Sequence, residues 1–224
     1  WISAYLMSSL SPQQFVELLH SYGINNPDIH PSMSLCLGPC EVSVSEMVSG
    51  YTVFANHGIR TAPILVSRIE DNEGNVLAEF QPRMNEVISA EAADKMLVLL
   101  RGVIDGGTGG RIRHKYNIEG EIGGKTGTNR NSDAWFIGFT PQLVSGCWVG
   151  GEDRDIHFDS MTYGQGASMA LPIWAYYMQK IYKDKTLDYS PDVRFELPTG
   201  FNPCDKTTEA DDGLDGFSMD EVYE

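Results

Sequence analysis

The stretch Gly123-Gly124-Lys125-Thr126-Gly127-Thr128 decides the fold of this chain. A phosphate-binding loop would need Gly, four residues and then Gly-Lys-Thr at the start of a helix. Here Gly120 precedes Gly124 by only three intervening residues, and Gly127 comes where a helix would have to begin. The stretch is therefore predicted to be a strand, in which Lys125 and Gly127 share one face by alternation.

A strand of this composition has two explanations. Glycine inside a strand often marks the close approach of a ligand or of another backbone. A sheet edge with a lysine beside it suits a bound peptide that carries a carboxylate. The alternative is a hairpin lysine with ordinary turn glycines, and the hexamer alone does not separate the two.

The residues on either side predict an α+β protein with an antiparallel sheet flanked by helices. Helices are expected where capping residues precede apolar residues at helical spacing, and strands where short apolar runs are bounded by turn residues. The expected helices run from Ser11 to Gly23, from Ser43 to about Gly58, from Ser89 to Gly106, and onward from Pro172. The expected strands are a hairpin, 63–70 with 76–80, and a meander of 120–128, 134–139 and 143–150.

Composition limits the possible functions. The chain has 224 residues and 42% apolar residues, enough for one domain with a real core. A net charge of −15 argues against binding to nucleic acid or to anionic membranes. Residues 186–224 hold eleven acidic and two basic residues. We therefore expect a domain over 1–185 and a largely disordered acidic tail over 186–224.

Four cysteines are too few for a disulfide framework. Cys36 and Cys40 flank a Leu-Gly-Pro turn, so they either form a small local disulfide or remain two thiols. A zinc site would need two further ligands nearby, and none is evident. No metal or other cofactor is expected. The tryptophans Trp135, Trp148 and Trp174 are expected to pack between the sheet and the last helix.

The basic residues are concentrated between Arg101 and Arg130. This segment contains six basic and three acidic side chains, a local excess of +3. This segment either attracts an anionic substrate or compensates acidic residues nearby.

Several segments together resemble the transpeptidase domain of class A (bifunctional) penicillin-binding proteins. Lys-Thr-Gly is one of the three motifs of the penicillin-recognising serine enzymes. The resemblance extends from about residue 1 to about residue 183 and implies the C-terminal part of a transpeptidase domain with a β-lactamase-like fold. The segments that carry it are 46–51, 54–60, 106–109, 123–128, 132–141 and 147–150.

The resemblance implies a serine acyltransferase that acts on D-Ala-D-Ala stem peptides of peptidoglycan and is acylated by β-lactams. Lys125 would join the proton-transfer and carboxylate-binding network. The hydroxyls of Thr126 and Thr128 would bind the terminal carboxylate, and Gly127 would admit the substrate. The backbone N–H of Thr128 would supply half of the oxyanion hole.

The chain departs from the family in one decisive respect. No serine has a lysine three residues on, and none has an asparagine two residues on, so the Ser-x-x-Lys and Ser-x-Asn motifs are absent. We expect the chain to begin just downstream of them and to be inactive alone. The resemblance also implies a parent with an upstream membrane anchor and glycosyltransferase domain, working outside the cytoplasmic membrane. The alternatives are a non-catalytic module that senses β-lactam or peptidoglycan, and a hydrolase in which water replaces the acceptor amine.

Overall fold

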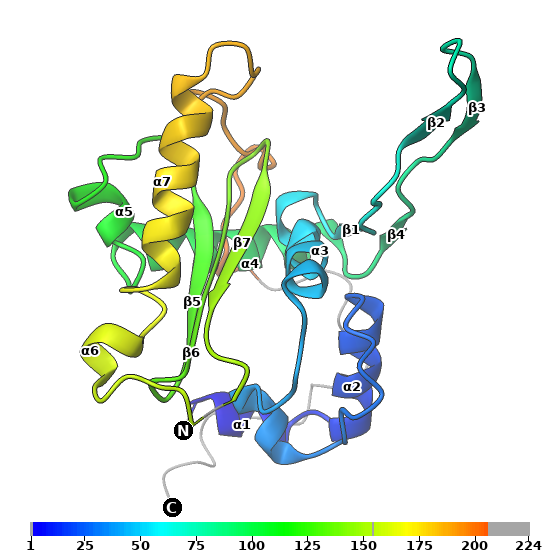
Figure 1. Ribbon diagram of the computed structural model, residues 1–224. Helices are drawn as coiled ribbons and strands as arrows, with labels where there is room; N and C mark the ends of the chain where they lie inside the picture. The colour runs from blue at the N-terminus through cyan, green and yellow to red at the C-terminus, as the bar shows by residue number, and fades with distance from the viewer. Residues whose placement is uncertain (1, 154, 206–224) are drawn as a thin grey trace, which may run out of the picture.

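A computed structural model describes residues 2–153 and 155–205 of the chain. One three-stranded sheet lies at its centre, with helices against both faces (Figure 1). The helices are α1 (Ile2–Ser8), α2 (Pro12–Ser21), the 3₁₀-helix η1 (Met33–Leu37), α3 (Val44–Ala55), α4 (Ala90–Asp105), α5 (Arg111–His114), α6 (Met161–Gly164) and α7 (Ala170–Lys183). The strands are β1 (Ile59–Thr61), β2 (Arg68–Glu70), β3 (Val76–Glu79), β4 (Met84–Glu86), β5 (Gly123–Asn129), β6 (Asp133–Phe139) and β7 (Val144–Val149). The predicted α+β class is confirmed.

The central sheet is an antiparallel meander in the order β5-β6-β7, as the short connections predicted. Its register places Thr126 opposite Phe136 and Lys125 opposite Ile137. Directly opposed residues share a face of a sheet. The side chains of β5 therefore alternate between the two layers of helices.

One face of the sheet packs against α7. The ring of Phe136 contacts Trp174 of α7 in an edge-on arrangement, with ring centroids 5.3 Å apart. Both residues are almost fully buried, together with Ile104 and Ile112 from the segments that precede β5. Burial of side chains of this size contributes about 1.5–3 kcal/mol each, so this cluster fixes α7 on the sheet.

The other face packs against α3 and α4. Phe139 of β6 lies in a cluster with Leu97 and Leu100 of α4, bordered by Tyr51 and Phe54 of α3. Burial raises the pKa of Tyr51 to about 12. A third cluster, formed by Met7, Val16, Ile24, Ile29 and Leu35, holds α1, α2 and η1 together.

The helix boundaries follow their capping residues. Ser43 and Glu46 form a complete capping box at the start of α3. The side chain of Ser89 accepts the backbone N–H of Ala92 at the start of α4. Proline opens α2 and stands in the first turn of α7. The four predicted helices are therefore confirmed, while η1, α5 and α6 were not predicted.

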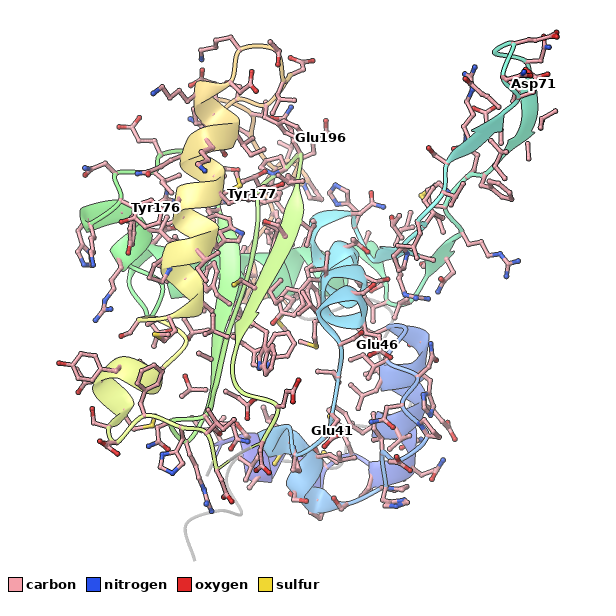
Figure 2. The ribbon with its side chains drawn as sticks, in the orientation of Figure 1. Glu41, Glu46, Asp71, Tyr176, Tyr177 and Glu196 are labelled. Atoms are coloured by element: carbon pink, nitrogen blue, oxygen red, sulfur yellow. The ribbon has the colours of Figure 1, made fainter. Side chains whose placement is uncertain are left out.

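Residues 59–86 form a long two-stranded arm that projects from the body (Figure 1). At its root β1 pairs with β4, and near its end β2 pairs with β3. Asp71 lies at the far end (Figure 2). The predicted hairpin is confirmed only over Arg68–Glu70 and Val76–Glu79, since residues 63–67 form no strand and the pair at the root was not predicted.

The structure also shows the state of the cysteines and the positions of the tryptophans. Cys36 and Cys40 are both free thiols. Trp174 is buried against the sheet as expected, but the prediction is wrong for Trp135 and Trp148, which do not lie between the sheet and α7, and Trp148 is 38% exposed. Trp148 pairs with Trp135 and donates its indole N–H to Asp133, on the face of the sheet away from α7.

The first part of the predicted tail packs against the domain. The ring of Phe195 contacts Phe139, and the backbone N–H of Phe195 donates to the carboxylate of Glu121. The amide of Gln142 donates to the carbonyl of Asp188. The domain boundary at residue 185 stays a prediction, and residues 206–224 of the predicted tail lie outside the described residues.

Candidate active site

The candidate site lies along β5, the strand that carries Lys125, Thr126, Gly127 and Thr128. Within the described part of the chain, β5 pairs with β6 on one side and with no strand on the other. Lys125 and Thr128 are exposed, and Thr126 and Gly127 are partly exposed. An open strand edge with accessible side chains is the arrangement in which an extended peptide can bind.

Lys125 and Gly127 lie on the face of the sheet that α3 and α4 cover, because Lys125 is opposite Ile137 and Gly127 is opposite Trp135. The Nζ atom of Lys125 donates to the carbonyl of Thr126 at 2.9 Å. A Cβ at position 127 would lie 2.9 Å from the Cβ of Trp135, so the tight packing against β6 favours glycine there.

Thr126 and Thr128 lie on the opposite face, toward α5 and α7. The Oγ1 atom of Thr126 is 2.7 Å from the Oγ1 atom of Thr108, in the loop after α4. The Oγ1 atom of Thr128 accepts the backbone N–H of Gly166 at 3.1 Å. Both hydroxyls of the Lys-Thr-Gly-Thr strand are thus held by partners from other segments.

The loop between α6 and α7 packs directly on β5. A Cβ at Gly166 would lie 2.4 Å from the carbonyl oxygen of Gly127 and 2.3 Å from that of Trp135, so no other residue fits without displacing the loop. Arg111 anchors the next two residues, since its guanidinium donates to the carbonyl of Ala167 and to the hydroxyl of Ser168, each at 3.2 Å.

Most of the basic residues near the site have structural partners. Arg101 is paired with Glu121 at 2.9 Å, and Arg113 with Asp105 at 3.0 Å. These pairs favour the second explanation of the local positive charge, compensation of nearby acidic residues. Lys125 remains the exposed cation on the candidate strand itself.

Sequence reasoning missed two contributors to the site. Thr108 lies in segment 106–109, which carries part of the family resemblance, but no role was predicted for it. A single hydroxyl between glycines could have indicated a role in the site. The loop at Gly166 carried no such signal. Among residues 2–153 and 155–205, no group of three potential metal ligands is brought together. Over the same residues, no helix has both the length and the apolar character needed to cross a bilayer.

The sequence profile of the family described as penicillin binding protein transpeptidase domain matches residues 10–147 of the chain. The chain belongs to this family. Penicillin-binding protein 1A of Aquifex aeolicus is 32% identical over 220 residues, covering 96% of this chain. Penicillin-binding protein 1A of Rickettsia conorii is 30% identical, covering 88%. The resemblance to class A penicillin-binding proteins is thereby confirmed.

Solved structures support the same fold. The crystal structure of penicillin-binding protein 1A from Haemophilus influenzae superposes with a TM-score of 0.74 and 26% identity, covering 84% of this chain and 33% of that one. Penicillin-binding protein PonA1 from Mycobacterium tuberculosis, also solved in complex with penicillin V, shows the fold at 24% identity, with TM-scores of 0.72 and 0.68. The predicted penicillin-binding transpeptidase fold is confirmed. The chain spans about 28% of the Aquifex relative and 26% of the Rickettsia relative.

Proposed function

We propose that this chain is part of a peptidoglycan cross-linking D,D-transpeptidase, and that β5 binds the D-Ala-D-Ala end of a stem peptide. The observation that carries the proposal is the open edge of β5, with an exposed lysine and two accessible threonine hydroxyls in sequence. The membership of the transpeptidase family supports it.

Each residue of the strand has a role in the proposal. The hydroxyls of Thr126 and Thr128 bind the terminal carboxylate of the donor peptide, since a carboxylate only accepts hydrogen bonds. Lys125, on the opposite face of β5 from the two threonines, takes part in proton transfer and adds positive charge at the strand that binds the carboxylate. The backbone N–H of Thr128 stabilises the oxyanion that forms when a serine attacks the scissile carbonyl. Gly127 leaves room for the substrate at the strand.

The reaction itself needs a serine nucleophile. In the proposed step the serine oxygen forms an ester with the penultimate D-alanine, the terminal D-alanine leaves, and an amine of a second stem peptide displaces the serine. The sequence contains no Ser-x-x-Lys motif. The proposal therefore assigns the nucleophile and the membrane anchor to a longer protein that works outside the cytoplasmic membrane. A β-lactam would acylate the same serine.

The missing motifs favour one second candidate, a module that binds β-lactam or peptidoglycan without turnover. Incubation with benzylpenicillin followed by intact-mass measurement separates the two. We expect no adduct on this chain, and one adduct on the protein extended at its N-terminus to include a Ser-x-x-Lys segment. An extended protein that is folded and stays unlabelled would contradict the transpeptidase and leave the binding module.

A further inference from the structure

Thr108 is the only residue with a side chain in the loop Gly106-Gly107-Thr108-Gly109-Gly110. Its hydroxyl lies 2.7 Å from that of Thr126, within the range of a good O–H···O hydrogen bond. Thr108 is exposed to solvent, and Thr126 is partly exposed. A glycine-rich loop after α4 thus presents one hydroxyl group to the candidate strand.

The loop holds Thr108 in a fixed position. The backbone N–H of Gly106 donates to the carbonyl of Gly102, and that of Gly109 to the carbonyl of Val103, so the loop continues the hydrogen bonding of α4. A Cβ at Gly107 would lie 2.9 Å from the Cα of Val103, which excludes a larger residue next to Thr108. Side chains on such supported backbone lose little freedom when they bind a ligand.

Each of the two threonines of β5 has a hydrogen-bond partner from another segment, but the two partners differ. At Thr128 the partner is the backbone N–H of Gly166, which can only donate, so the Oγ1 atom of Thr128 accepts and its own proton is free for another acceptor. At Thr126 the partner is a second hydroxyl, and either oxygen can be the donor. For Thr126 also to bind a carboxylate, its hydroxyl proton must be free to be donated to the carboxylate.

We propose that Thr108 is a positioning residue for carboxylate recognition: its O–H donates to the Oγ1 atom of Thr126, which directs the proton of Thr126 to the substrate carboxylate. The reverse donation would leave Thr126 with no proton to give. Hydrogen bonds in a chain also polarise one another, which strengthens the outer bond to the anion. This inference rests on the proposed function and adds a residue to it.

The test compares an acid with its ester in the N-terminally extended protein. Benzylpenicillin carries the carboxylate, and benzylpenicillin methyl ester does not. We expect Thr108→Val to lower the second-order acylation rate constant for the acid about tenfold, because Thr126 is no longer oriented and its hydrogen bond to the charged carboxylate is weakened, and to leave the ester unchanged. Thr108→Ser should restore the rate for the acid. Thr162→Val, at an exposed threonine of α6, is the matched control.

A double variant tests whether Thr108 acts through Thr126. Because Thr108 acts through Thr126, Thr108→Val combined with Thr126→Val should lose no more rate with the acid than Thr126→Val alone. Equal losses for acid and ester in Thr108→Val would indicate a merely structural role and overturn the inference. So would an unchanged rate with the acid. A wild-type extended protein that neither compound acylates would instead overturn the proposed function, and with it the assignment of Thr108.

Discussion

The Nδ1 atom of His57 lies 3.0 Å from the Oδ1 atom of Asp94. Asp94 is buried in α4, whereas the side chain of His57 is 43% exposed, in the turn between α3 and β1. The backbone of His57 has a φ of 47°, in the left-handed region that non-glycine residues seldom adopt. The contact therefore holds a strained residue at the root of the arm and supplies a hydrogen-bond partner for a buried carboxylate.

His57→Ala should lower the free energy of unfolding by about 1–3 kcal/mol, because the carboxylate of Asp94 loses this partner. His57→Gly loses the same bond but relieves the left-handed backbone, so its loss should be smaller by about 1 kcal/mol. Urea denaturation of the two variants measures the difference. Equal stability of the alanine and glycine variants would mean that the φ of His57 carries no cost.

Glu46 links stability to pH through the capping box of α3. Hydrogen bonds from the backbone N–H and the hydroxyl of Ser43, both at 2.8 Å, and from the backbone N–H of Asn25 lower the pKa of the Glu46 carboxyl, with the backbone of Ser43 as the main cause. A group with a lowered pKa stabilises the fold above its unfolded pKa. That stabilisation disappears as the pH falls through the folded pKa.

Glu46→Gln should therefore cost less than about 1 kcal/mol at neutral pH, since the site is largely open to solvent, and nothing at acid pH. Thermal melting between neutral pH and about pH 3 measures the convergence of variant and wild type. Glu41→Gln, at an exposed glutamate in the segment just before α3, is the control and should follow the wild type throughout (Figure 2). A constant difference in melting temperature between Glu46→Gln and wild type at every pH would contradict this role.

Gly166→Ala should destabilise the protein by about 1–3 kcal/mol, because its Cβ would meet the carbonyl oxygens of Gly127 and Trp135. Gly102→Ala is the matched control, since a Cβ there meets nothing within 4 Å and the residue lies in the interior of α4. That variant should gain up to about 1 kcal/mol. Melting followed by circular dichroism gives both values, and a Gly166→Ala variant as stable as wild type would show that the loop can move off β5 freely.

The arm should contribute little to the stability of the body. Leu65 is fully exposed, and its neighbours in the sequence, Ile64 and Val66, are about half-exposed. Leu65→Ser should leave the melting temperature unchanged, whereas Leu97→Ala, in the cluster with Phe139, should cost about 2–5 kcal/mol. We also expect Leu65→Ser to reduce the binding of a hydrophobic dye. A clear loss of stability in Leu65→Ser would show that the arm packs in solution.

Local signals made the helices predictable. Ser43 with Glu46, and Ser89, cap their helices through hydrogen bonds to residues three positions on, whereas Ser11 makes no side-chain capping bond and α2 begins at Pro12. The meander was predictable for the same reason, because its turns are short. The pairing between β1 and β4 was not predictable, because each strand has only three residues and the whole arm separates them in the sequence.

The candidate site was predictable only as a strand. Alternation correctly separated Lys125 and Gly127 from the two threonines, because that depends on the backbone alone. The partners of the threonines come from elsewhere in the chain: Thr108 lies 18 residues before Thr126, and Gly166 lies 38 residues after Thr128. Such contacts arise from packing of helices on the sheet and leave no periodic pattern. The roles assigned to Lys125, Thr126, Gly127 and Thr128 stay predictions.

The uninterrupted order of β5, β6 and β7 has a consequence for the folding of a chain that emerges from its N-terminus onward. The whole sheet emerges before α7 does, because Ala170 follows Val149 in the chain. Until Trp174 follows, the side of the sheet that bears Phe136 has no cover from its own helix. Chains truncated between β7 and α7 should therefore be bound by chaperones that bind exposed apolar strands, whereas chains that include α7 should not.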